Sequence, residues 1–135
     1  MKKLLSISYP PLAFNFSMLV LRISMGVLMM SHGYEKLIDF SKEQAGFYNF
    51  LNIGTTASLL LSIFAEFFCA LFITIGLFTR LTVIPLLINM GIAVFAVHSM
   101  DFFGKGELGT LYFIGFFVLL LCGPGKLSVD GISSK

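Results

Sequence analysis

Long apolar runs separated by short polar segments make up most of the chain. Four such runs lie at about residues 14–34, 56–78, 81–99 and 108–122. A helix needs about 20 mostly apolar residues to cross a hydrocarbon core about 30 Å thick. The fourth run is the shortest, so it would recruit flanking residues or lie where the bilayer is thin. The pattern predicts four membrane-spanning helices.

The connections between the runs indicate how the helices are arranged. Only "TR" separates the second run from the third, and "MDFFGKGE" leads into the fourth. Short connections place successive helices antiparallel. The longest connection, about residues 39–55, contains Phe47, Tyr48 and Phe50, which favours a segment anchored in the membrane interface, although a plain loop is also compatible. We therefore predict an all-α, integral membrane, antiparallel four-helix bundle that forms one domain over residues 1–135.

The composition agrees with a membrane protein. Hydrophobic residues make up 57% of the chain and charged residues 12%, against about 25% charged in a typical soluble domain. The net charge of +2 comes from scattered basic residues, so no nucleic-acid partner is expected. Cys69 and Cys122 lie in apolar runs without a CxxC motif, and we interpret them as small core residues.

Lysine and arginine set the predicted orientation, because cytoplasmic loops carry more of them. If both termini are cytoplasmic, the inner side holds five basic residues and the outer side three. The inner set is Lys2, Lys3, Arg80, Lys126 and Lys135, and the outer set is Lys36, Lys42 and Lys105. The N-terminus has no clear apolar segment followed by a cleavage site, which favours a short cytoplasmic leader.

Two charged residues lie deep inside the predicted spans. Arg22 is in the first and Glu66 in the second, and charges at such positions usually face other helices. At 100° per residue the first span places its polar and small residues on one stripe, namely Asn15, Arg22, Gly26, Met29, Gly33 and Lys36. The second span has a similar stripe of Ser62, Glu66, Cys69 and Ala70. We expect Arg22 and Glu66 to form an ion pair, which either fixes helix register or leaves Glu66 available to a proton relay or quinone site.

A second polar group is predicted at the outer ends of the helices. His32, Lys36, His98, Asp101 and Glu107 come from three spans and fall at about one depth. Histidine exchanges protons near neutral pH, which suits the reduction and protonation of a quinone. Three interpretations stay open for this outer cluster: solvated helix ends, a quinone or proton-handling site, and a metal or haem site. The candidate catalytic residues are His32, Lys36, Glu66, His98 and Glu107, with no metal expected.

Three sequence blocks resemble the DoxX family of small bacterial membrane proteins. The blocks are "RISMGVLMMSHGYEK", Glu66 followed by "IGLFTR", and "ELGTLYFIGFFVLLLCGPGKLSVD". The resemblance implies a four-helix bundle of the bacterial inner membrane and a link to redox systems, since the family is similar to the small subunit of a thiosulfate:quinone oxidoreductase. Five residues match positions of the family pattern, namely Arg22, Lys36, Glu66, Arg80 and Glu107. Of these, we place Arg22, Glu66 and Arg80 in a structural polar core.

The favoured function is that of a membrane subunit of a quinone-linked redox system. Such a subunit would contact the bilayer, bind a quinone and work with a soluble redox protein. Two other functions stay open: a non-catalytic scaffold or anchor for a soluble redox partner, and a transporter of protons or small solutes that acts as a homo-oligomer. The sequence leaves open whether the chain is itself an enzyme.

Overall fold

The structure is a computed structural model that describes residues 4–134 of the 135-residue chain. Lys2, Lys3 and Lys135, which enter the predicted charge count, lie outside the described residues. Every regular element in the described part is helical. The first long helix, α1, covers Pro11–Ile38. Pro11 occupies its first position, where the missing N–H costs nothing because that group has no helical partner.

The remaining long helices follow the predicted apolar runs within a few residues. One continuous helix, Thr55–Ile75, consists of α3 (Thr55–Ile63), a π-helical turn η2 (Phe64–Cys69) and α4 (Ala70–Ile75). It ends at Gly76, which adopts a left-handed conformation with φ of 76°. A second, Thr79–Val97, consists of α5 (Thr79–Ile92) and the π-helical turn η3 (Ala93–Val97), and α6 covers Glu107–Cys122.

Three short elements complete the chain. The helix α2 (Phe40–Gly46) and the 3₁₀ turn η1 (Phe50–Asn52) lie in the long connection after α1. The helix α7 (Val129–Ser133) lies near the C-terminus. We call the end of the molecule formed by residues 39–54 and 98–106 the loop end, and the opposite end, formed by residues 76–79 and 123–134, the terminal end.

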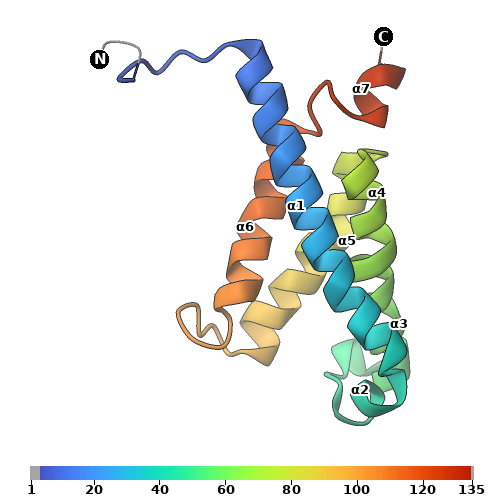
Figure 1. Ribbon diagram of the computed structural model, residues 1–135. Coiled ribbons are helices and arrows are strands. Elements are labelled where there is room, and N and C mark those ends of the chain that lie inside the picture. Colours follow the sequence, from blue (N-terminus) through green and yellow to red (C-terminus); the bar gives the residue numbers. More distant parts are fainter. Residues whose placement is uncertain (1–3, 135) are drawn as a thin grey trace.

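Successive long helices run in opposite directions (Figure 1). The helix α1 runs from the terminal end to the loop end, α3–α4 returns, α5 descends again, and α6 rises to the terminal end. The helix α1 packs on η2 and α4, and α5 packs on α6, while α6 also contacts α1. The centre of this assembly is apolar and includes Met29, Ile73, Leu86 and Phe116, each at most 1% exposed.

Three helices in the described residues are long and apolar enough to cross a membrane: Pro11–Ile38, Thr55–Ile75 and Thr79–Val97. The helix α6 is apolar but has only 16 residues.

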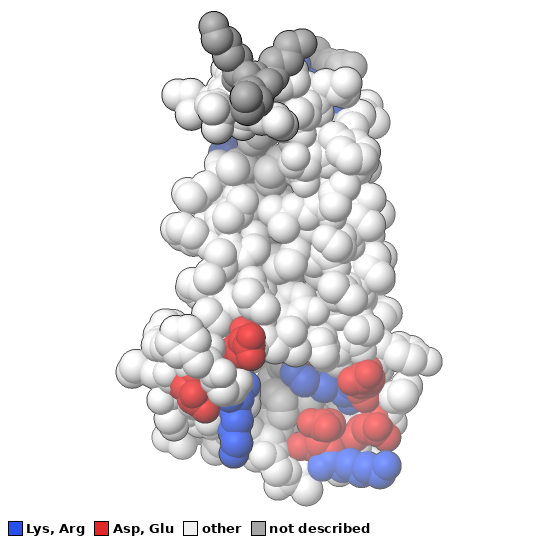
Figure 2. Space-filling model, turned by 60° about the vertical axis from the view of Figure 1, so that its left-hand side comes forward, with Lys and Arg blue, Asp and Glu red and all other residues white. Residues whose placement is uncertain are grey.

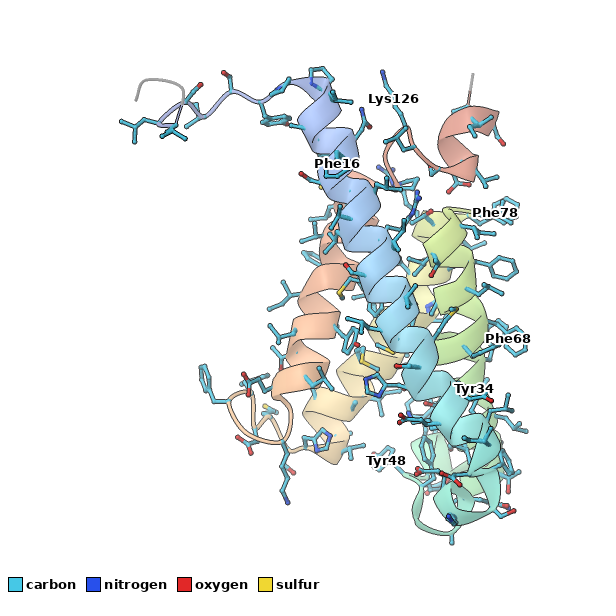
Figure 3. The ribbon with its side chains drawn as sticks, in the orientation of Figure 1. Phe16, Tyr34, Tyr48, Phe68, Phe78 and Lys126 are labelled. Carbon is cyan, nitrogen blue, oxygen red and sulfur yellow. The ribbon has the colours of Figure 1, made fainter. Side chains whose placement is uncertain are left out.

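Large apolar side chains also cover the outside of the helices. Phe68 and Phe78 lie on the outer side of the second long helix and its end (Figure 3), and Phe16, Phe68 and Phe78 are 59%, 47% and 63% exposed. Charged side chains gather near the loop end on the face shown in Figure 2 and leave a broad uncharged band above it. These features identify an integral membrane protein.

Two glycines set the register between α1 and the second long helix. A Cβ atom on Gly26 would lie 3.0 Å from the carbonyl oxygen of Ala70, and one on Gly33 would lie 2.7 Å from backbone atoms of Glu66 and Phe67. Backbones can approach this closely only where a helix carries no side chain. Of the six residues of the predicted stripe on α1, Arg22, Gly26, Met29 and Gly33 are buried, and Asn15 and Lys36 are half-buried.

Candidate functional site

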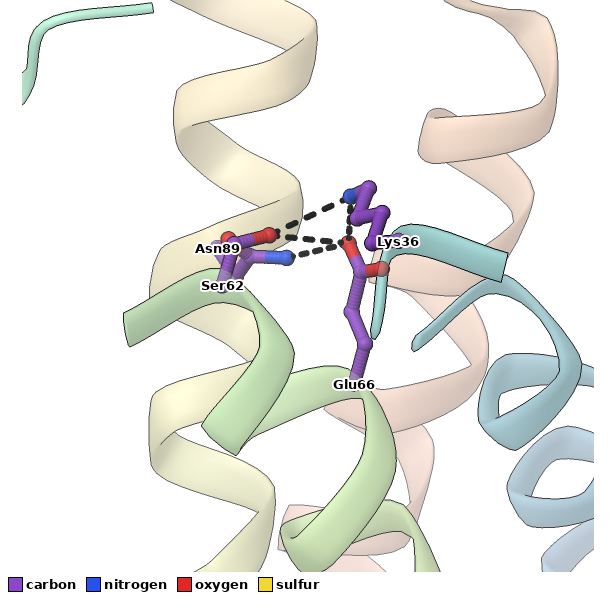
Figure 4. Close-up of polar contacts among 4 residues, drawn as sticks. All are labelled: Lys36, Ser62, Glu66 and Asn89. Atoms are coloured by element: carbon purple, nitrogen blue, oxygen red, sulfur yellow. Dashed lines mark hydrogen bonds and ion pairs between the residues drawn. The ribbon is translucent and has the colours of Figure 1, made fainter. Parts of the chain in front are cut away.

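Glu66 is the centre of a polar cluster at the loop end (Figure 4). Its Oε1 atom accepts hydrogen bonds from Lys36 Nζ at 2.6 Å, Asn89 Nδ2 at 2.7 Å and Ser62 Oγ at 3.3 Å. Lys36 Nζ also donates to Ser62 Oγ at 3.2 Å. The Glu66 side chain is 3% exposed and that of Lys36 is 25% exposed. We call these four residues the polar cluster.

Local sequence explains how the polar cluster forms. Ser62 precedes Glu66 by one helical turn, so the two side chains share a face. Lys36 follows Gly33 by about one turn, and the close approach at Gly33 brings the lysine alongside Glu66. Glu66 lies within the π-helical turn η2. Such turns are rare and are frequent at functional sites, which marks this part of the helix.

The polar cluster borders a cavity of about 610 Å³. Ligand cavities in proteins usually measure about 300–1,000 Å³ and combine apolar walls with a few polar groups. All four cluster residues line this cavity, and His98 lines it as well. The remaining walls come from α2, η1, α3, η2, α5 and η3, and are mostly apolar or aromatic. The cavity therefore has the size and character of a site for an amphipathic small molecule.

The cavity opens on the side of the helices. Leu61, Phe64 and Ile88 line it, and their side chains are 54%, 51% and 54% exposed. All three belong to helices that are long and apolar enough to cross a membrane. The side opening therefore faces lipid, and a lipid-soluble molecule can enter from the bilayer.

Aromatic residues of the long connection form the wall at the loop end. Phe47, Tyr48 and Phe50 line the cavity, and Lys36 Nζ lies 5.6 Å from the centre of the Phe47 ring. Tyr48 lies at the loop end in Figure 3. The sequence predicted these side chains as membrane-interface anchors, and the structure adds that they enclose the cavity.

The predicted ion pair between Arg22 and Glu66 is wrong. Glu66 pairs with Lys36, and Arg22 donates instead to the carbonyl oxygens of Pro124 at 3.2 Å and Leu127 at 2.9 Å. The register explains the error. Gly33 lies against Glu66, whereas Arg22 lies against Gly76, ten residues further along the second helix. At 1.5 Å per residue this difference is about 15 Å, beyond the reach of the arginine side chain.

Arg22 belongs to a separate group of contacts at the terminal end. Asp130 accepts hydrogen bonds from the N–H groups of Phe78 and Thr79, each at 2.8 Å, and so caps the start of α5. The Asp130 N–H in turn donates to the carbonyl of Gly76 at 2.9 Å. We call Arg22, Asp130 and these backbone partners the terminal lock, because they attach the C-terminal segment to α1 and to the turn before α5.

Arg80 does not belong to a buried polar core, which corrects that prediction. Its side chain is exposed, and its Nη2 donates to the carbonyl of Leu121 at 3.3 Å. The contact links the start of α5 to the end of α6 at the surface. The sequence already placed the two differently, since Arg22 lies inside the first predicted span and Arg80 in the connection between the second and third, and only the family resemblance grouped them.

The predicted outer cluster divides into two parts. Lys36 and His98 line the cavity, whereas His32 packs edge-on against Tyr112 with ring centres 5.8 Å apart. Glu107 is exposed at the start of α6, and Asp101 accepts from the N–H of Lys105. Within residues 4–134, no three His, Cys, Asp or Glu side chains are grouped as they would be around a metal ion. Of the two histidines, only His98 belongs to the cavity wall.

Asn89 is a member of the site that sequence reasoning missed. It stands alone as a strongly polar side chain in the predicted third span, between Arg80 and His98. An amide inside a membrane segment is costly unless it is hydrogen bonded, so its position was a usable signal. Asn89 carries no charge and therefore does not stand out among the ionisable residues of the spans.

Comparison with known proteins places the chain in a family. The family model described as DoxX matches residues 17–99, more than half of the chain. The chain belongs to the DoxX family. The matched range includes the whole polar cluster and His98, whereas α6 and the C-terminal part of the terminal lock, with Asp130, lie beyond it.

One curated relative has also been found. The chain is 29% identical over 136 aligned positions to the uncharacterized membrane protein Rv3486 of Mycobacterium tuberculosis. The match covers 88% of this chain and 82% of that protein. No solved structure matches the chain. These comparisons support a membrane protein of the DoxX family and leave the chemistry of the cavity to be inferred from its geometry.

Proposed function

We propose that this chain is the membrane subunit of a quinone-linked redox system, and that the cavity holds the quinone head group. The observation that carries the proposal is a polar cluster placed in an otherwise apolar cavity that opens toward lipid. A quinone dissolves in the bilayer and has a flat apolar ring with polar oxygens. The resemblance to the small subunit of a thiosulfate:quinone oxidoreductase points to the same class of system.

The cavity retains hydrogen-bond donors for the oxygens of such a head group. An ammonium group has three donors and an amide NH₂ group has two. Lys36 uses two of its donors within the polar cluster, and Asn89 uses one on Glu66. One donor on each side chain is therefore free for a ligand, and His98 adds an imidazole that can donate or accept a hydrogen bond.

The proposal includes a membrane arrangement. The helix α6 is the fourth span and completes an antiparallel four-helix bundle in the bacterial inner membrane, with both termini cytoplasmic. The cavity then lies toward the outer face, where a soluble redox protein exchanges electrons with the bound quinone. The antiparallel order of the long helices and the packing of α6 on α1 and α5 support this arrangement.

A non-catalytic scaffold is the second candidate. The observation that favours it is the concentration of exposed charges at the loop end, among them Asp39, Lys42, Glu43 and Lys105, which offers a soluble protein a polar docking surface (Figure 2). The two candidates differ in what they require of the cavity. A scaffold keeps its function when cavity residues are changed, and a quinone site does not.

The test is equilibrium binding of a decyl-substituted benzoquinone to the purified chain in lipid nanodiscs, with empty nanodiscs as the reference for partition into lipid. We expect saturable binding that weakens about tenfold in Asn89→Ala and His98→Ala, because each variant removes a hydrogen-bonding group. The matched control is His32→Ala, since His32 packs on Tyr112 and is not among the residues that line the cavity. Binding equal to that of empty nanodiscs, or identical binding by all three variants, would overturn the proposal.

A further inference from the structure

A second recess lies at the terminal end, between the start of α1 and the segment that follows α6. Its volume is about 370 Å³, which is within the usual range of ligand sites, about 300–1,000 Å³. The residues that line it are Tyr9, Pro11, Phe14, Asn15, Gly125 and Lys126. The rings of Tyr9 and Phe14 are stacked with their centres 6.0 Å apart, so they form an aromatic wall. We call this site the terminal recess.

Asn15 holds the one charged residue that lines the terminal recess against α1. Its Oδ1 accepts from the backbone N–H of Lys126 at 2.8 Å, and its Nδ2 donates to the carbonyl of Pro11 at 2.8 Å. The Lys126 side chain is exposed and points out beyond the terminal end in Figure 3. It forms no ion pair with any residue between 4 and 134. The recess therefore offers an accessible ammonium group beside an aromatic wall.

The terminal recess lies at the level of lipid head groups. The helix α1 has 28 residues and is about 42 Å long at 1.5 Å per residue, whereas a hydrocarbon core is about 30 Å thick. Its ends therefore extend among the head groups, and the recess is at its first turns. Leu12 and Phe16 in the same turns are 75% and 59% exposed, which provides apolar surface for acyl chains. A lysine at this level keeps its stem on apolar surface and its ammonium among phosphates.

The charges of the described residues differ between the two ends of the molecule. The carboxylates exposed at or next to the loop end are those of Glu35, Asp39, Glu43, Asp101 and Glu107. At or beside the terminal end, Arg80 and Lys126 are exposed. Asp130 is the one carboxylate in the described part of the terminal end, and its two oxygens already accept backbone N–H groups. The terminal end therefore attracts anions, and the loop end does not.

We propose that the terminal recess binds an anionic phospholipid, with the Lys126 ammonium on the lipid phosphate and an acyl chain along Phe14 and the outer face of α1. The site is separate from the proposed quinone cavity and does not depend on it. A phosphate accepts strong, charge-assisted hydrogen bonds from an ammonium group. A zwitterionic lipid has the same phosphate but also a cation, which weakens its attraction to Lys126. A free phosphate ion would leave the aromatic wall uncovered.

The experiment is native mass spectrometry of the purified chain in an uncharged detergent, titrated with phosphatidylglycerol or with phosphatidylcholine that has the same acyl chains. We expect the first phosphatidylglycerol to bind about fivefold more tightly than the first phosphatidylcholine, which is the usual contribution of one lysine near an anionic lipid. Lys126→Met keeps the stem and should remove the preference. Arg80→Met is the matched control and should retain it, because Arg80 is exposed but does not line the terminal recess.

The variant Tyr9→Ala tests the aromatic wall. Tyr9 precedes α1 and is 69% exposed, so its removal should leave the fold intact. We expect both lipids to bind about threefold more weakly, because the acyl chain loses apolar contact, while the preference for phosphatidylglycerol remains. Inorganic phosphate in large molar excess is the probe for a soluble anion, and we expect it to displace no lipid.

Four outcomes would overturn the proposal. The first is equal binding of the two lipids by the unmodified chain, and the second is a loss of preference in Arg80→Met as large as that in Lys126→Met. The third is displacement of phosphatidylglycerol by inorganic phosphate, because the site would then belong to a soluble anion. The fourth is unchanged binding of both lipids by Tyr9→Ala, which would place the lipid outside the terminal recess.

Discussion

The polar cluster and the terminal lock both combine a cation on α1 with a carboxylate from another part of the chain, yet they are built differently. In the lock, both carboxylate oxygens of Asp130 accept backbone N–H groups, and Arg22 donates to two backbone carbonyls. In the cluster, Glu66 uses one oxygen for three side-chain donors and leaves the other unused. The lock ties backbone segments together, whereas the cluster holds side chains beside a cavity.

The difference separates architecture from candidate function. Arg22 Nε also lacks a partner, but Arg22 is not among the residues that line the cavity, so no ligand reaches it there. Glu66 lies in a π-helical turn, and the π-helical turn η3 ends next to His98 on the opposite wall. Irregular helix and unused hydrogen-bonding capacity therefore occur together at the loop end.

Breaking the terminal lock should have the largest effect on stability. Arg22→Met leaves the carbonyls of Pro124 and Leu127 without their charged donor, and we expect a loss of about 3 kcal/mol in the free energy of unfolding. Reversible unfolding in mixed detergent micelles measures it. Arg80→Met is the control and should cost about 0.5 kcal/mol, since Arg80 is exposed and makes one long hydrogen bond. An equal loss in both variants would contradict the buried role of Arg22.

A substitution at the helix contact should disturb the cluster and leave the lock intact. Gly33→Ala places a Cβ 2.7 Å from backbone atoms of Glu66 and Phe67, so α1 must shift away from η2. We expect a stability loss of about 1–3 kcal/mol together with weaker benzoquinone binding, because Lys36 moves relative to Glu66. The measurements are unfolding and binding in the same preparation.

Gly46→Ala is the matched control for the Gly33 substitution. Gly46 lies at the loop end, and a Cβ there meets no atom within 4 Å, so this variant is a control for stability alone, because Gly46 itself lines the cavity. We expect its stability to change by less than about 0.5 kcal/mol. A Gly33→Ala protein with unchanged stability and binding would show that the contact with η2 does not set the position of Lys36.

The smallest expected effect is a pH dependence of the terminal lock. Burial by itself would raise the pKa of Asp130, but hydrogen bonds from Thr79 and Phe78 and the charge of Arg22 outweigh it and hold the pKa below its ordinary value of 3.8. A carboxyl with a lowered folded pKa stabilises the protein above its unfolded pKa, and this contribution is lost as the pH falls through the folded pKa. We expect the Tm advantage of the unmodified protein over Asp130→Asn to be constant from pH 7 to about 5 and to shrink below about pH 4.

Benzoquinone binding provides the contrast for this pH experiment. Asp130→Asn should retain it at pH 7, because Asp130 in α7 lies at the terminal end and the cavity near the loop end. A Tm difference that stays constant down to pH 3 would contradict the role assigned to Asp130. Loss of benzoquinone binding in Asp130→Asn would contradict the independence of the two regions.

Much of the helical framework could be predicted from the chain, because apolar run length and helical periodicity are local properties. Burial of Arg22, Gly26 and Gly33 followed from the 100° rotation between residues. The partner of Arg22 did not, because it depends on how far α1 slides along its neighbour. The relative height of α1 and the second long helix is set by close contacts at Gly26 and Gly33. The ends of the apolar runs do not give this height accurately.

The residues of the candidate site could be predicted only in part, because the sequence does not give the contacts between helices. Lys36, Glu66 and His98 are ionisable residues near or within apolar runs and were recognised as such, whereas Asn89 is uncharged and was passed over. His32 and Glu107 were grouped with them because the sequence indicates depth along a helix. It does not indicate the direction in which a side chain points between neighbouring helices, and His32 turns toward Tyr112.

The sequence by itself determined that the chain is helical, that it belongs in a membrane and which residues of α1 face other helices. Those properties follow from composition and from the period of a single helix. Only the tertiary structure decided that Lys36, rather than Arg22, pairs with Glu66, that Asn89 joins them, and that a cavity opens beside them toward lipid. These features depend on the relative height and rotation of separate helices, which for α1 and the second long helix are set by the backbone contacts at Gly26 and Gly33.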